Sequence, residues 1–305
     1  MNKTITKRLA AGLTVTMLLS GCSSQSGQSG GAETDGSDSD SEYGSIKTVE
    51  SPAGFTGNTG EVSVESGDTY AVITIQGFGS VTCKLFPEAA PEGVQNFIDL
   101  ANSGYYNGKE IHRVVANFII QGGSANGDGI LMEEDIKFDV EYNANMRHYY
   151  GALCFSGSNN INSSQFYFVN KKSYDPPSGA ELKSNVEYFE EQISLCKEAA
   201  AASLNEEDKA NFEYEAELYT IWNYACKSQL RAYQELTDEM IAKYWEVGGT
   251  PYLDGAYTVF GQTVEGFDVI DAISAVEVEE QPTYDNELSH PVQPIIIQSV
   301  EIFTA

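Results

Sequence analysis

The sequence predicts a mainly β fold in which many short strands form a barrel or a sandwich, interrupted once by a helical segment. Two observations predict it: short runs of alternating apolar and polar residues recur along the chain, and helical patterns between them are few. The length of 305 residues allows one large domain or two small ones. A hydrophobic content of 41%, with 18 Tyr and 14 Phe, is sufficient for a core.

The first folded elements are a hairpin and a helix. Tyr70–Gln76 and Ser80–Phe86 are alternating, β-branched runs separated by Gly77-Phe78-Gly79, which predicts a β-hairpin. Pro91 then opens a segment whose apolar residues keep helical spacing, and Gly104 is typical of a helix end.

Six further runs predict strands, and one more segment predicts a second helix, Val264–Val276. The strands are Ile111–Val115, Phe118–Gln121, Gly151–Phe155, Gln165–Val169, Tyr257–Gly261 and Ile295–Phe303. Many short strands with few helices favour a barrel or a sandwich.

A different pattern, from Ser184 to Val247, interrupts these strands. Two apolar stripes at helical spacing predict a helical hairpin, and Thr237 begins a third, shorter helix that Gly248 ends. The sequence Ser203-Leu204-Asn205-Glu206 between the stripes has the form of a capping box. We expect the stripes to pack against each other rather than to hold a cofactor.

The N-terminus has the pattern of a secretory signal. Three cations, at Lys3, Lys7 and Arg8, precede the apolar run Leu9–Leu19, which is too short to span a bilayer as a helix. The run meets Leu19-Ser20-Gly21-Cys22, which resembles the lipobox of bacterial lipoproteins. The alternative is an ordinary cleaved signal with an incidental cysteine. We expect a signal peptide over 1–21, with lipid attached to Cys22.

Residues 22–61 are expected to form a flexible, acidic Ser/Gly linker, because the stretch up to Asp40 has almost nothing apolar to bury. The folded domain would then occupy 62–305. It would lie outside the cytoplasm, anchored by lipid to a bacterial membrane.

Composition excludes several classes of function. A net charge of −28 argues against nucleic acid as a partner and against electrostatic binding to anionic lipid. The chain has three His and no CxxC pair, and no Ser-His-Asp or Cys-His arrangement is suggested, so neither a hydrolase nor a metal site is indicated. Gly122–Gly129 lacks the Lys of a phosphate loop and predicts a turn. Cys83 and Cys154 remain open as a buried pair or as two free thiols.

Five separated motifs resemble, in order, those of the cyclophilins, the peptidyl-prolyl cis-trans isomerases. They are Phe86–Pro91 with Asn96-Phe97, Gly104–Gly108, Ile111–Gly123, Ser163–Phe168 and Tyr252–Gly261. The resemblance covers about 62–170 and 248–305. It implies a closed, eight-stranded antiparallel barrel capped by two helices, with the helical hairpin inserted at 171–246.

The resemblance also implies the site. Arg113 corresponds to the catalytic arginine, Phe118 to the floor of a proline pocket, and Gln121 to a residue that binds the substrate backbone. The other residues expected to contact substrate are Ile119, Phe155, Gln165, Tyr167, Tyr252, Leu253 and Tyr257. His112 precedes the arginine, and strand alternation would point it to the opposite face, so we expect a structural role.

This sequence departs from the family pattern at several pocket positions. Ile119 stands where Met is frequent, and Tyr167 where Phe is frequent. Tyr252 and Tyr257 stand where Trp and His are often found. The segment Phe155–Ser158 replaces an Ala-Asn-Ala sequence that cradles the substrate backbone in the family.

The sequence therefore predicts a peptidyl-prolyl cis-trans isomerase without a cofactor, acting on proline-containing peptides and on unfolded exported proteins. Rotation about a prolyl amide needs no proton transfer and no covalent step. A fixed cation aimed at the amide nitrogen stabilises the twisted amide more than the planar one. The alternative is a non-catalytic module that binds proline peptides or acts as a chaperone through its helical insert. The sequence does not predict an oligomeric state.

Overall fold

The computed structural model describes residues 44–130 and 136–305. The predicted signal peptide, Cys22 and the linker up to residue 43 lie outside the described residues. Among the helices that are described, none is long and apolar enough to cross a membrane.

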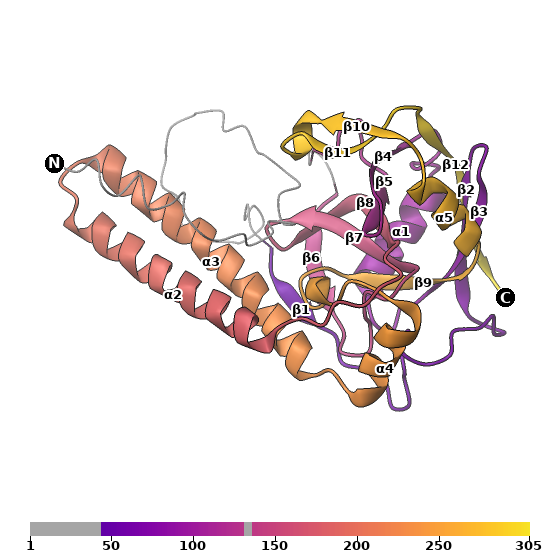
Figure 1. Cartoon of the computed structure of the whole chain (residues 1–305), viewed down its shortest axis with the longest axis horizontal. Coiled ribbons are helices and arrows are strands. Elements are labelled where there is room, and N and C mark those ends of the chain that lie inside the picture. Colours follow the sequence, from indigo (N-terminus) through magenta and orange to yellow (C-terminus); the bar gives the residue numbers. More distant parts are fainter. Residues whose placement is uncertain (1–43, 131–135) are drawn as a thin grey trace.

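Eight strands form a closed antiparallel barrel, as predicted (Figure 1). Neighbouring strands are hydrogen-bonded in the order β8-β5-β4-β12-β2-β3-β9-β7, and β7 pairs with β8 as well, which closes the ring. The strands are β2 (Thr69–Ile75), β3 (Gly79–Leu85), β4 (Glu110–Val115), β5 (Ile119–Gly122), β7 (Ala152–Ser158), β8 (Ile161–Val169), β9 (Val259–Glu265) and β12 (Ile295–Thr304).

Two helices bury their apolar faces against the barrel core. Helix α1 (Pro91–Asn102) contributes Phe97, and α5 (Phe267–Ser274) contributes Ile270. The interior is rich in aromatic rings, namely Phe97, Tyr106, Phe155, Phe166 and Phe260. Alternate residues of each strand fill this interior, which leaves the other face of the sheet to build a site.

The linker predicted to extend to residue 61 is folded over its described part. Strand β1 (Ile46–Thr48) pairs in parallel with β6 (Phe138–Tyr142), which extends the sheet beside β8. Asn58 is fully buried, and its amide nitrogen donates to the Arg147 carbonyl at 2.7 Å. The linker prediction was wrong here, because a few buried side chains anchor a stretch that is otherwise polar.

A second small sheet was missed by the sequence analysis. Strands β10 (Val278–Gln281) and β11 (Glu287–Pro291) form a hairpin with the short helix η2 (Pro282–Tyr284) between them. We call residues 278–291 the β10–β11 hairpin. Its strands are short, and their exposed residues are Glu279, Glu280 and the apolar Leu288, so they have no clear apolar alternation.

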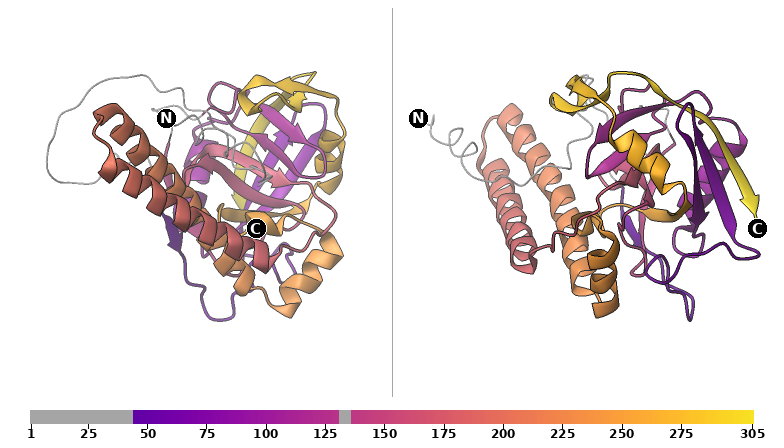
Figure 2. Two further views of the ribbon diagram at one scale, coloured as in Figure 1. Left: turned by 60° about the vertical axis from the view of Figure 1, so that its left-hand side comes forward. Right: turned by 45° about the vertical axis from the view of Figure 1, so that its right-hand side comes forward.

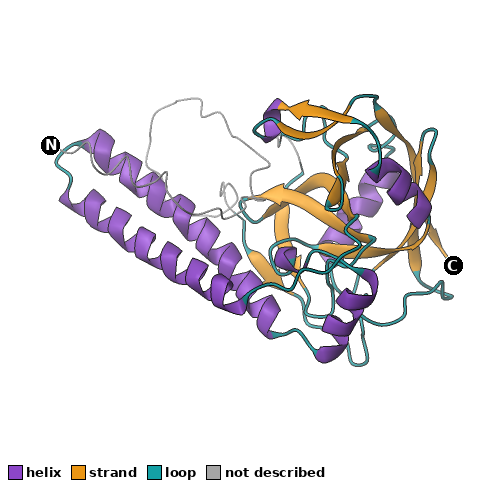
Figure 3. Ribbon diagram, viewed as in Figure 1, coloured by secondary structure: helices purple, strands orange, loops and turns teal. Residues whose placement is uncertain are grey.

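The helical insert consists of three helices, coloured purple with the other helices in Figure 3. Helices α2 (Gly179–Ala202) and α3 (Glu206–Gln234) form a long antiparallel pair, and α4 (Asp238–Val247) leads back to the barrel. Figures 1 and 2 show the pair projecting from one side of the barrel. Asn205, not Ser203, caps α3, since its side-chain oxygen accepts from the backbone of Glu207 at 2.9 Å.

The apolar stripes of α2 and α3 pack against each other, as predicted. Val186, Phe189 and Cys226 form a buried cluster, joined by the rings of Tyr219 and Trp222. Cys83, Cys154, Cys196 and Cys226 are all free thiols.

Candidate active site

Strand register brings three of the predicted site residues into one row. Arg113 on β4 lies opposite Gln121 on β5, and Gln121 lies opposite Tyr167 on β8. Their sequence neighbours Val114, Ile120 and Phe166 point into the barrel core. Because side chains alternate along a strand, the row lies on the outer face of the sheet.

An apolar cluster adjoins this row. It contains the predicted pocket residues Phe118, Ile119, Tyr167 and Leu253, with Tyr252 and Tyr257 packed against them. The rings of Phe118 and Tyr252 are stacked with centroids 6.1 Å apart, and Tyr257 meets Tyr167 edge to face at 6.2 Å. The structure thus gathers side chains from β5, β8 and the 252–257 segment into one largely buried aromatic cluster.

Arg113 is a buried cation, only 7% exposed, at the edge of this aromatic cluster. Its Nε and Nη2 donate to the two carboxylate oxygens of Glu287 at 2.7 and 3.1 Å, and Nη1 donates to Gln121 at 3.3 Å. The guanidinium carbon lies 4.7 Å from the ring centre of Tyr284 and 5.9 Å from that of Phe118. Two aromatic faces and one carboxylate therefore compensate for the loss of water around the charge.

Gln121 is held by a chain of amides. Its oxygen accepts from Arg113, while its Nε2 donates to Gln165 at 3.0 Å and to Ser156 at 2.9 Å. Gln165 in turn donates to the carbonyl of Gly129 at 3.1 Å. These contacts fix which end of the Gln121 amide faces the arginine, so the guanidinium meets an oxygen.

Glu287 and Tyr284 are site residues that the sequence analysis missed. Both come from the β10–β11 hairpin, and Glu287 is 174 positions from its partner Arg113. The available signal was the Asp285-Asn286 pair, whose backbone is left-handed at both residues, as in a tight hairpin turn. That signal predicts the hairpin but not the arginine that it reaches.

The prediction for Phe155 was wrong. We expected it to contact substrate, but it is fully buried inside the barrel and stacks on Phe260 with centroids 4.0 Å apart. Its neighbour Cys154 belongs to the outer cluster instead. Because Leu153, Cys154 and Phe155 are all apolar, their alternation did not reveal which of them points inward.

His112 is fully buried beside the arginine. Its Nε2 lies 3.4 Å from the Tyr284 hydroxyl, and its backbone carbonyl contacts Nδ1 of His290 at 3.3 Å. Burial, and then the charge of Arg113, lower the pKa of His112 from 6.5 to about 4. The imidazole is therefore neutral at pH 7 and adds no second positive charge beside Arg113.

Gly129 permits the close packing of Tyr284. Its φ is +79°, and a Cβ at this position would collide with the Tyr284 hydroxyl.

Within the described residues, no group of three or more His, Cys, Asp or Glu side chains is arranged to hold a metal ion.

A closed barrel with an arginine and a glutamine paired across two strands, beside an aromatic cluster, defines a cyclophilin-type site. Residues 70–189 and 243–302 match the family model described as "Cyclophilin type peptidyl-prolyl cis-trans isomerase/CLD", and together they make up more than half of the chain. The chain belongs to this family. The unmatched stretch 190–242 contains most of the α2–α3 pair.

Curated relatives of this chain are named after the same activity. A protein of Staphylococcus aureus (strain NCTC 8325 / PS 47), named "Putative peptidyl-prolyl cis-trans isomerase", is 30% identical over 227 residues, covering 73% of this chain and 87% of the relative. A protein of the same name from Staphylococcus epidermidis (strain ATCC 12228 / FDA PCI 1200) is 28% identical, with the same coverage. A cyclophilin-type isomerase of Cryptosporidium parvum, crystallised in the presence of the dipeptide Ala-Pro, matches with a TM-score of 0.46 and 18% identity, over 77% of this chain and 99% of that one.

We predict that His112 makes the protein less stable in mild acid. Below pH 6.5 the unfolded chain binds a proton at this residue, whereas the folded chain, with a pKa of about 4, does not. The free energy of unfolding should therefore fall as the pH is lowered from 7 to 4.5, and less steeply in a His112→Asn variant. Urea titrations of both proteins across this range measure the effect, and parallel curves would contradict it.

Proposed function

We propose that this chain catalyses the cis-trans isomerisation of prolyl peptide bonds in exported proteins, with Arg113 as the group that stabilises the twisted amide. The observation that carries the proposal is the buried Arg113 guanidinium, which is fixed at the edge of the aromatic cluster. A peptide that places its proline ring on Phe118 would bring the prolyl nitrogen close to this cation, since the guanidinium carbon is 5.9 Å from that ring.

The chemistry follows from the amide itself. Resonance holds the peptide bond planar, and the barrier to rotation is about 18–20 kcal/mol. In the twisted state the prolyl nitrogen regains its lone pair and becomes a hydrogen-bond acceptor. A donor aimed at this nitrogen binds the twisted state more tightly than the planar state, which lowers the barrier.

Arg113 retains donors for this role. A guanidinium has five N–H bonds, and the contacts within the described residues engage one on each nitrogen. One N–H of Nη1 and one of Nη2 are left for the substrate. Glu287 accepts from Nε and Nη2 and so fixes the plane of the guanidinium. The two remaining N–H groups are therefore already oriented before a peptide binds.

Gln121 and the aromatic cluster support the substrate. Gln121 lies directly across from Arg113, within reach of a peptide backbone that crosses β4 and β5. Phe118, Leu253 and Tyr167 offer apolar area to the proline ring and exclude water. Low local polarity strengthens the hydrogen bond from the arginine.

We further propose that the protein works outside the cytoplasm on a lipid anchor at Cys22. The basic start, the short apolar run and the tetrapeptide that ends in Cys22 support this proposal. Uncatalysed prolyl isomerisation takes tens to hundreds of seconds, so an isomerase held at the membrane would act where newly exported chains still have to fold. Unfolded exported proteins are thus the proposed substrates.

The first prediction from the proposed function concerns the cation Arg113. An Arg113→Ala variant should lose about two to three orders of magnitude in kcat/KM on a proline-containing tetrapeptide, as when a donor to a transition state is removed. An Arg231→Ala variant is the matched control, because Arg231 is a cation on α3 that donates to Thr48 and lies over the ring of Tyr142, neither of which belongs to the cluster. Undiminished turnover by Arg113→Ala would remove Arg113 from the mechanism, and tight peptide binding without turnover by the wild type would favour the binding-module alternative.

The second prediction concerns Glu287. Its carboxylate lowers the positive potential at Arg113, so a Glu287→Gln variant, which keeps one acceptor in place, should raise kcat/KM by about three- to tenfold. Glu280→Gln is the matched control, because Glu280 is an exposed residue of the same hairpin. A fall in kcat/KM would contradict this prediction. It would show that the main effect of the Glu287 carboxylate is to hold Arg113 in place, not to lower the positive potential there.

The third prediction concerns the anchor. When the full chain is expressed in a bacterium, the wild type should sediment with membranes, whereas a Cys22→Ser variant should lose its lipid and be found in the soluble fraction. Fractionation followed by immunoblotting measures this. Recovery of both proteins in the same fraction would contradict the lipid anchor.

A further inference from the structure

The hydroxyl of Tyr167 has a buried partner that links the aromatic cluster to the helical insert. Tyr167 is 3% exposed, and its hydroxyl oxygen lies 3.0 Å from Nε2 of His148. The two rings are nearly parallel, with an interplanar angle of 16° and centroids 6.2 Å apart. The thiol of Cys154 is a second hydrogen-bond partner of this hydroxyl. Because burial leaves a phenol few alternatives, these two contacts determine where the end of the Tyr167 ring lies.

Asp254 holds His148 in turn. One carboxylate oxygen lies 2.9 Å from Nδ1 of His148 and accepts from its backbone N–H at the same distance. A carboxylate at Nδ1 favours the tautomer that carries its proton there, which leaves Nε2 to accept from Tyr167. His148 and Asp254 are 0% and 3% exposed, so water does not compete for these contacts.

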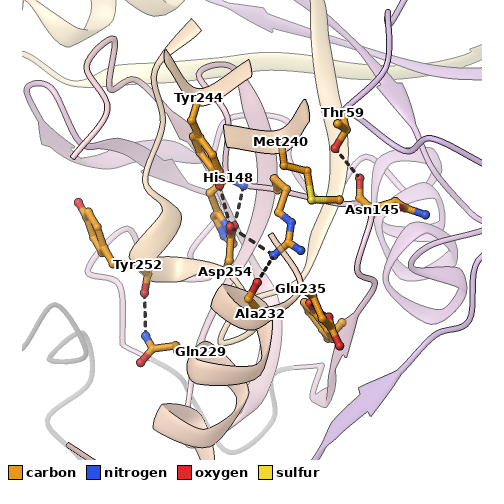
Figure 4. A network of polar contacts seen from close by, with 12 residues as sticks. Thr59, Asn145, His148, Gln229, Ala232, Glu235, Met240, Tyr244, Tyr252 and Asp254 are labelled. Atoms are coloured by element: carbon orange, nitrogen blue, oxygen red, sulfur yellow. Dashed lines mark hydrogen bonds and ion pairs between the residues drawn. The ribbon is translucent and has the colours of Figure 1, made fainter. Parts of the chain in front are cut away.

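The insert supplies the other end of this chain of contacts (Figure 4). The Tyr244 hydroxyl, on α4, donates to the second oxygen of Asp254 at 2.7 Å. Arg147 lies 3.5 Å from the same oxygen and donates to the carbonyl of Ala232, on α3, at 3.1 Å. Tyr244 and Arg147 are fully buried. The polar contacts therefore run without a break from the insert to the predicted proline pocket.

A second contact also joins the insert to the aromatic cluster. Gln229 on α3 donates to the carbonyl of Tyr252 at 2.7 Å and so holds the segment that carries Tyr252 and Leu253. The backbone there lies so close to α3 that a Cβ on Gly255 would sit 2.5 Å from the Ser228 carbonyl oxygen. Gly255, with a φ of +80°, fits where another residue would not.

We propose that Tyr244 is a positioning residue of the insert, which acts through Asp254 and His148 to hold Tyr167 as a wall of the proline pocket. The proposal rests on the proposed function, because it takes the cluster around Phe118 and Tyr167 to be the substrate site. Its consequence is that the insert sets affinity for a prolyl segment. Arg113 lies outside this chain of contacts, so the chemical step is left unchanged.

The experiment is a double-mutant cycle read by peptide binding. Tyr244→Phe removes only the hydroxyl that donates to Asp254, and Tyr167→Phe removes the hydroxyl at which the chain of contacts ends. A fluorescent tetrapeptide containing Ala-Pro is the probe, and its Kd is measured for the wild type, both single variants and the double variant. KM and kcat are measured in parallel, and Tm is recorded for each protein.

We expect Tyr244→Phe to raise the Kd and KM of the wild type by about three- to tenfold, the equivalent of one hydrogen bond, with little change in kcat. In the Tyr167→Phe background the same change should raise Kd by less than about twofold, since the last contact is already absent. Tyr224→Phe is the matched control, because it removes an insert hydroxyl that reaches Ile46 rather than the cluster.

Two results would overturn the proposal: an equal rise in Kd in both backgrounds, or a fall in Tm without a change in Kd. Neither depends on turnover. If the wild type bound the peptide but did not isomerise it, the proposed function would fail while the cycle still tested whether Tyr244 positions Tyr167.

Discussion

The burial of one cation is the constraint on which the candidate site depends. Arg113 is 7% exposed, and a buried guanidinium without partners would destabilise the fold by several kcal/mol. The β4–β5 register supplies Gln121, and the β10–β11 hairpin supplies Glu287 and Tyr284. His112, next in sequence, is kept neutral by a pKa of about 4, which avoids a second charge. The hairpin is therefore part of the site and not merely a connection between α5 and β12.

The chain's topology explains how an insert comes to border this site. The insert leaves the barrel after β8, which carries Tyr167, and returns just before the segment that carries Tyr252 and Leu253. Both junctions thus lie beside the aromatic cluster, where Gln229 of α3 contacts Tyr252 and Tyr244 of α4 contacts Asp254. The barrel, the β10–β11 hairpin and the insert therefore all border the candidate site.

The sequence predicts the parts of the structure that local spacing determines. Alternation predicted the eight barrel strands, and helical spacing predicted α1, α5 and the insert. Arg113 and Gln121 face each other because the short turn between them, with Asn117 left-handed at φ 58°, fixes the register of a hairpin. Contacts over long separations could not be predicted in this way. Glu287 reaches Arg113 across 174 positions, and Tyr244 reaches Tyr167 only through His148 and Asp254. Phe155 was misplaced because three successive apolar residues have no readable alternation, and β1 because a three-residue strand in a polar stretch has no pattern.

The central claim is that Arg113 stabilises the twisted prolyl amide more than the planar one. Exchange NMR on a bound proline-containing peptide tests it most directly, because it measures the cis-trans interconversion rate on the enzyme separately from affinity. The account predicts that replacing Arg113 by Ala slows interconversion on the enzyme by about a hundredfold or more, while Kd changes by only a few-fold. An unchanged rate on the enzyme, with the entire loss in Kd, would contradict it.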